Sequence, residues 1–161
     1  MSRGDERGPT AASSDPPESL AAAARSIVLA ENPCEKVLLA RRAADLWHRR
    51  ALSLGHLSAR NAMPDRPGRP AHPELRPPRD MPRRTAHSEV GRVALLHSLA
   101  HIELNAVDMT WDLVGRFARE PMPMHFFDDW VRVGLEEAEH FTLVAQRLGE
   151  LGAAYGDFPA H

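Results

Sequence analysis

The sequence holds a single cysteine, Cys34, among its 161 residues. One thiol cannot form an internal disulfide, and it excludes a zinc site built from several cysteines. No apolar run reaches the roughly 18 residues that a transmembrane helix needs. The opening segment MSRGDERGPTAASSDPP also lacks the apolar stretch of a secretory signal. These absences predict a cytoplasmic protein with no membrane partner.

Neither sign of charge dominates, because 20 Lys and Arg residues face 22 Asp and Glu residues, for a formal net charge of -2. A balanced chain creates no basic field that would attract nucleic acid. The sequence also lacks a Gly-x-Ser-x-Gly elbow, a Cys/His arrangement and a glycine-rich phosphate loop. These observations argue against a nucleic-acid partner and against nucleophilic catalysis.

Helical periodicity is present and no strand alternation competes with it, so we predict an all-α fold. A pair of shorter helices is expected over residues 15–54. Asp15 followed by proline indicates a start for a helix over 16–31, and Asn32 followed by proline indicates a second helix over 33–53.

Two longer helices are expected over residues 88–119 and 124–151. The Glu120-Pro121-Met122-Pro123 link interrupts the periodic pattern between them. Two long helices joined by so short a link fold back on each other. Residues 88–161 are therefore predicted to form an antiparallel helix hairpin, which is half of a four-helix bundle.

The remaining segments have little helical character. Residues 1–14 are small, polar and charged, and we expect a disordered tail there. Residues 55–87 hold seven prolines and seven arginines, a density that forbids a regular helix. We interpret this segment as an extended Pro/Arg-rich arm, either a linker or a strap along the domain surface. The alternative is a docking arm for an acidic partner or RNA, although no aromatic residues interleave.

The stretch LEEAEHF combines three glutamates and a histidine in seven residues. Helix neighbours three, four and seven positions from Glu137 are apolar, as are those of Glu103 on the preceding helix. Glu136 and Glu139 instead fall among charged residues and are expected to face solvent. Glu103 is predicted to be a lone carboxylate in the core-facing seam of the hairpin, where it needs a cation, a hydrogen bond or a proton.

Depth along the hairpin gives a second criterion. At about 1.5 Å per residue, Glu103, Glu137 and His140 all lie about 24–28 Å from the turn at Pro121. We therefore expect the three side chains to meet at one level. Two carboxylates and an imidazole suit iron or manganese, and also zinc. The alternative is a hydrogen-bonded Glu/His cluster that holds the register of the helices and binds no metal.

A second polar stripe runs along the same helix as Glu103. It joins His97 and His101 to Asn105, Asp108 and Asp112. The stripe is interpreted as facing solvent or a polar interface. Histidines four residues apart can also chelate a metal. His101 could instead hold a ligand of the Glu103 site in position without binding the metal itself.

Four long segments of the chain carry a resemblance to known sequences: PDRPGRPAHPELRPPRDMP, LLHSLAHIELNAVD, MPMHFFDDWVRV and EEAEHFTLVAQRLGELGAAYGDFPAH. They resemble a bacterial family of uncharacterised proteins, the ferritin-like domain of unknown function 455. The resemblance runs from about residue 20 to the last residue.

This resemblance implies a ferritin-like bundle, more distantly similar to di-iron oxygenases such as tRNA hydroxylases. It implies Glu103, Glu137 and His140 as first-half metal ligands, with iron as the cofactor and manganese as the alternative. Members of the family continue further and bring a second helix pair with further ligands. The chain is therefore expected to be a C-terminally truncated member, which a homodimer could complete.

Two functions follow from these expectations. The first is a di-iron oxidoreductase or oxygenase, whose small-molecule substrate cannot be read from the residues. The second is a non-catalytic helical module that binds a protein partner through the hairpin seam and the arginine-rich arm. Metal retained on purification would favour the first function, and a metal-free dimer stable in chelator would favour the second.

Overall fold

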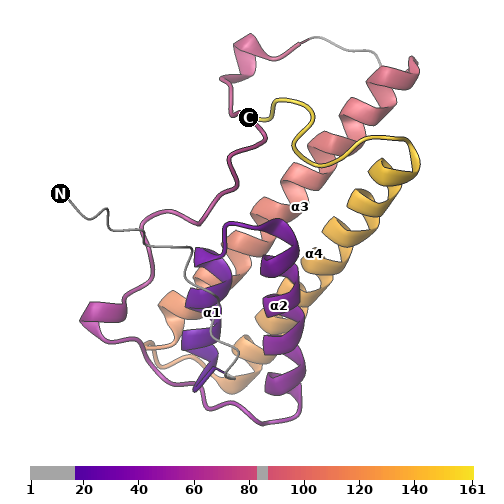
Figure 1. Ribbon diagram of the computed structural model, residues 1–161. Coiled ribbons are helices and arrows are strands. Elements are labelled where there is room, and N and C mark those ends of the chain that lie inside the picture. Colours follow the sequence, from indigo (N-terminus) through magenta and orange to yellow (C-terminus); the bar gives the residue numbers. More distant parts are fainter. Residues whose placement is uncertain (1–16, 83–86) are drawn as a thin grey trace, which may run out of the picture.

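Four α-helices form the framework of the computed structural model, which describes residues 17–82 and 87–161 (Figure 1). They are α1 (Leu20–Leu29), α2 (Pro33–His48), α3 (Glu89–Phe117) and α4 (Met124–Glu150). The described residues contain two short 3-10 helices and two isolated β-bridges but no strand. The predicted all-α class is confirmed. None of the helices in these ranges combines the length and apolar character needed to cross a membrane.

The two long helices α3 and α4 pack side by side and run antiparallel (Figure 1). Ser88 caps α3, because its Oγ accepts a hydrogen bond from the Gly91 N–H at 3.0 Å. Pro123 occupies the N-cap position of α4, where the link between the two long helices ends. Both helices agree with the predicted bounds to within two residues.

The shorter helices α1 and α2 lie against the half of the hairpin that contains its turn (Figure 1). The largest side chains in the resulting core are at most 1% exposed, among them Trp47, Trp111 and Phe127. Several large apolar side chains of the hairpin lie outside this core. Ile102 and Met109 on α3 are 58% and 65% exposed, and Leu143 on α4 is 64% exposed.

The first helix begins later than predicted. The cap is Ser19, whose Oγ accepts from the Ala22 N–H at 3.2 Å, whereas Asp15 lies outside the described residues. The N–H groups of Leu20 and Ala21 donate to the carbonyls of Ser53 and Leu54. A segment far along the chain therefore fixes where α1 starts, which no local signal reveals.

The second helix ends earlier than predicted, at His48 and not near residue 53. Arg50 adopts a left-handed backbone conformation with φ of 57°. Its guanidinium forms a two-pronged ion pair with Asp128 of α4, with N–O distances of 2.7 and 3.0 Å. This contact to the hairpin accompanies the turn that returns the chain toward α1. The Asn32 cap at the other end of α2 is confirmed, since its Oδ1 accepts from the Cys34 and Glu35 N–H groups.

Residues 55–82 follow the surface of the helices as an extended strap. The Gly68 N–H donates to the Val28 carbonyl at 2.8 Å, and Arg116 of α3 donates to the Pro64 carbonyl at 2.8 Å. Met63 inserts into the core and is 9% exposed. The strap alternative for the Pro/Arg-rich segment therefore describes its path, except at residues 83–86, which lie outside the described part. The disordered tail predicted for residues 1–14 lies there too.

Candidate metal centre

The three predicted ligands lie together at the edge of the α3–α4 interface. The His140 Nδ1 atom is 3.4 Å from Glu103 Oε2 and 3.3 Å from Glu137 Oε2. One ligand atom from each residue lies within 4.8 Å of the other two. Atoms that bind one ion at about 2.1 Å lie about 3–4 Å apart, so the cluster needs little movement to enclose an ion. The predicted meeting of the three side chains at one level is observed.

The burial of this cluster differs from the prediction. The side chains of Glu103 and Glu137 are 21% and 23% exposed, and that of His140 is 53% exposed. The core-facing side of α3 is instead the neighbouring stripe with Ala100 and Leu104, which are 0% and 1% exposed. The expectation that Glu103 lies in a core-facing seam is therefore wrong, because α1 and α2 cover the adjacent face and leave this edge open.

The electrostatics of the cluster favour a bound proton or cation. Partial burial raises the pKa of Glu103, and the hydrogen bond and negative charge of Glu137 raise it further. The hydrogen bond to Glu137 raises the pKa of His140, against the opposing effect of desolvation. Two carboxylates this close repel each other unless a positive charge lies between them. A divalent cation can take the place of the proton that they otherwise share.

Neighbouring glutamates do not join the cluster. Glu136 and Glu139 are both exposed, as their charged helical neighbours predict. Within residues 17–82 and 87–161, only Glu103, Glu137 and His140 form a group of three or more potential ligands at metal-binding separation. Glu139 therefore provides a matched control for substitutions at Glu137.

His97, His101 and Asp108 of the second polar stripe are buried and Asn105 and Asp112 are partly buried, so the interpretation of the stripe as solvent-facing is wrong. His97 is 0% exposed and His101 is 6% exposed. The C-terminal tail covers both rings: the Gly156 N–H donates to His97 Nε2, and the Tyr155 hydroxyl lies 2.9 Å from His101 Nδ1. The polar-interface alternative describes this stripe, which meets the C-terminal tail at the two histidines and the strap at Asn105, Asp108 and Asp112.

The sequence did not lead us to expect that Asp108 of this stripe forms a buried ion pair with Lys36. Lys36 of α2 is 1% exposed and donates to Asp108, to the Val28 carbonyl and to the Gly68 carbonyl. Burial lowers the pKa of Lys36 and raises that of Asp108, and the ion pair opposes both shifts. A signal was available, because Lys36 shares its helical stripe with Leu39, Ala40 and Ala43.

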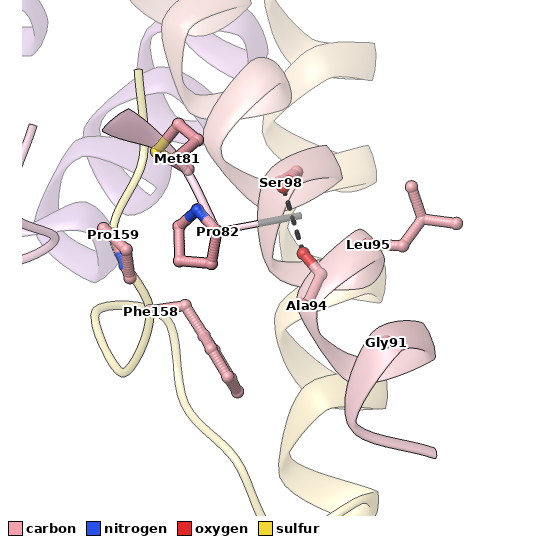
Figure 2. A pocket seen from close by; sticks show the side chains of 8 residues that line it. All are labelled: Met81, Pro82, Gly91, Ala94, Leu95, Ser98, Phe158 and Pro159. Atoms are coloured by element: carbon pink, nitrogen blue, oxygen red, sulfur yellow. Dashed lines mark hydrogen bonds between the residues drawn. The ribbon is translucent and has the colours of Figure 1, made fainter. Parts of the chain in front are cut away.

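Two cavities lie against α3. One, of about 230 Å³, is bounded by the start of α3, the end of the strap and the C-terminal tail (Figure 2). The side chains that line it are apolar except for Ser98, whose Oγ donates to the Ala94 carbonyl at 3.0 Å. Figure 2 shows Phe158 and Pro159 approaching this space from the tail. The other cavity lies between the strap and α3 and is lined largely by charged residues.

Residues 29–161 match the family described as "Protein of unknown function (DUF455)", and the chain belongs to this family. An uncharacterized protein of Haemophilus influenzae is 43% identical over 97 residues, which are 57% of this chain and 34% of that relative. The chain thus spans about a third of the length of the curated relative that it matches. No solved structure matches the chain. Neither the family description nor the relative assigns a fold class or a reaction.

Proposed function

We propose that Glu103, Glu137 and His140 bind a redox-active divalent metal, iron or alternatively manganese, in a ferritin-like oxidoreductase centre. The observation that carries this proposal is the convergence of three ligand atoms from two helices within 4.8 Å. Two carboxylates offset the charge of a divalent ion, and His140 Nδ1 adds a neutral nitrogen donor. Oxygen-rich ligand sets with one imidazole suit iron and manganese.

Each of the three residues would have its own role in binding the metal. Glu103 and Glu137 approach from different helices, so an ion held by both would fix the register of α3 against α4. His140 Nδ1 contacts both carboxylates and would be a terminal nitrogen ligand, and Glu137 is the candidate to bridge a pair of ions. An iron centre of this type supplies electron exchange with O₂. Because His140 is half exposed, solvent and small molecules reach the cluster from the open side.

Anaerobic titration with Fe(II), followed by calorimetry, tests metal binding. Glu137→Gln keeps the size of the side chain and removes its charge, and Glu139→Gln makes the same change two residues away on the exposed side of the helix. We expect Glu137→Gln to weaken Fe(II) binding by more than the roughly 10–100-fold that loss of an outer-shell partner costs. Glu139→Gln should bind as the wild type does. Equal affinities in all three proteins would contradict the assignment.

A second copy of the chain is proposed to complete the centre. Three protein ligands leave positions of a six-coordinate ion open. Apolar side chains surround the cluster: Leu99 lies one turn before Glu103 and is 38% exposed, and Leu143 lies one turn after His140 and is 64% exposed. A two-fold pairing of these surfaces would bury the apolar residues and bring two ligand sets together.

Native mass spectrometry of the metal-loaded protein tests this pairing. We expect a dimer with two metal ions, and Leu143→Glu should reduce both the dimer and the metal content. A monomer that holds its metal with unchanged affinity would contradict the pairing. A dimer that forms in chelator and takes up no iron or manganese would instead favour the non-catalytic interaction module.

A further inference from the structure

The second cavity has a volume of about 240 Å³ and lies between the strap and α3. Its lining includes Arg66 and Arg69 of the strap, and Asn105, Asp108 and Asp112 of α3. Asp112 is nine residues from Glu103, which at about 100° per residue places it on the opposite side of the helix. The cavity is therefore separate from the proposed metal centre.

The two aspartates of α3 that line this cavity already have partners. Asp112 accepts from Arg116 Nε at 2.7 Å, and Asp108 accepts from Lys36. Arg69 differs from them, because its Nη1 atom is buried and has no hydrogen-bond partner among the described residues. Its one charged contact is Asp108, at an N–O distance of 3.6 Å, and its side chain is 34% exposed.

The balance of charge leaves one positive charge unmatched. Three lining arginines and the adjacent Lys36 face three aspartates, since Asp65 also lines the cavity. The buried Nη1 atom of Arg69 carries N–H groups that have no acceptor among the described residues. A ligand with one negative charge and two parallel acceptor atoms would satisfy both conditions.

The apolar part of the cavity lining indicates the chemistry of the uncharged part of the ligand. Val28, Pro67 and Met109 border the same space and offer a surface for a short hydrocarbon chain. The three aspartates disfavour an ion with two or three negative charges, such as phosphate. The Asn105 side chain makes no hydrogen bond to the described residues and adds an amide that can donate to a carboxylate oxygen.

We propose that this cavity is a binding site for a small monocarboxylate. Arg69 holds the carboxylate through its guanidinium fork, and Pro67 and Met109 contact the aliphatic end. Asp108 lies between the Lys36 ammonium and the Arg69 guanidinium and pairs with both, so this pair of contacts holds Arg69 in position. The site does not depend on whether the Glu103 cluster binds a metal.

Titration of the ¹⁵N-labelled protein with butyrate, followed by NMR, tests the site. We expect saturable shifts at Asn105 and Arg69, and no such shifts with butyramide, which has the same shape without the charge. Arg69→Gln should weaken butyrate binding about 10-fold or more, because it removes a charge-assisted pair. Arg42→Gln, an exposed change on α2 outside the cavity, should leave binding unchanged.

Met109→Trp provides a variant that leaves the buried ion pairs intact. Met109 is 65% exposed, so the larger ring can enter the mouth of the cavity without disturbing the core. We expect it to block butyrate while the thermal transition stays that of the wild type. Absence of saturable shifts in the wild type, or unchanged binding in Met109→Trp, would overturn the site. Phosphate binding as tight as butyrate binding would overturn the assignment to a monocarboxylate.

Discussion

The close contact of α3 and α4 at Gly134 predicts opposite effects for two identical substitutions. A Cβ atom at Gly134 would lie 2.8 Å from Trp111 Nε1 and 3.1 Å from Thr110 Cγ2. Trp111 is 0% exposed and cannot move aside without disturbing the core. At Gly149, near the end of the same helix, a Cβ atom would meet nothing within 4 Å.

The magnitudes follow from these contacts. Replacing glycine by alanine inside a helix gains up to about 1 kcal/mol. Overpacking a tight core costs about 1–3 kcal/mol. Gly134→Ala should therefore lower the free energy of unfolding by about 1 kcal/mol, and Gly149→Ala should raise it by up to about 1 kcal/mol. The two variants should differ by about 2 kcal/mol.

Urea denaturation followed by far-UV circular dichroism measures this difference. Both variants should keep the wild-type helical signal in the absence of urea, because neither change breaks a backbone hydrogen bond. If Gly134→Ala stabilised the protein as much as Gly149→Ala does, the close packing of α3 against α4 at Gly134 would be wrong. The register that brings Glu103 level with His140 would then be in doubt as well.

Three further predictions concern stability. Asn32→Ala should cost about 1 kcal/mol, measured by thermal denaturation, because it removes the cap of α2, and an unchanged transition would exclude that role. Lys36→Met should cost about 3 kcal/mol or more in urea, because Asp108 stays buried without its ammonium partner, and Asp108→Asn in the same protein should restore part of the loss. Burial, followed by the charge of Arg69, lowers the pKa of His101 to about 4. Between pH of about 6.5 and about 4, His101 is protonated in the unfolded chain and neutral in the folded chain. The free energy of unfolding should therefore fall by up to about 3 kcal/mol as the pH drops toward 4. His101→Gln should flatten that profile, and a slope that persists would assign the effect to another group.

The hairpin could be predicted because its signals are local. Apolar periodicity and the proline-containing link each act within a few residues of the position that they define, as does the Asn32 cap at the start of α2. The convergence of Glu103, Glu137 and His140 also followed, since two antiparallel helices of regular rise fix the depth of every side chain. These features need no knowledge of what packs against the hairpin.

The covered face of α3 could not be predicted in the same way. His97 and His101 are buried by Tyr155 and Gly156, which lie more than 50 positions away in the sequence. Their polar neighbours suggested solvent because periodicity reports which residues share a face and not what covers it. The start of α1 shows the same limit, because hydrogen bonds from the segment at Ser53 determine it.

Nitrogen hyperfine coupling in the Mn(II)-loaded protein, measured by electron-nuclear double resonance, tests the central claim most directly. We predict coupling from one imidazole nitrogen, lost in His140→Gln and retained in His125→Gln, an exposed histidine on the same helix. A spectrum without nitrogen coupling, or coupling that survives His140→Gln, would contradict a metal centre at Glu103, Glu137 and His140.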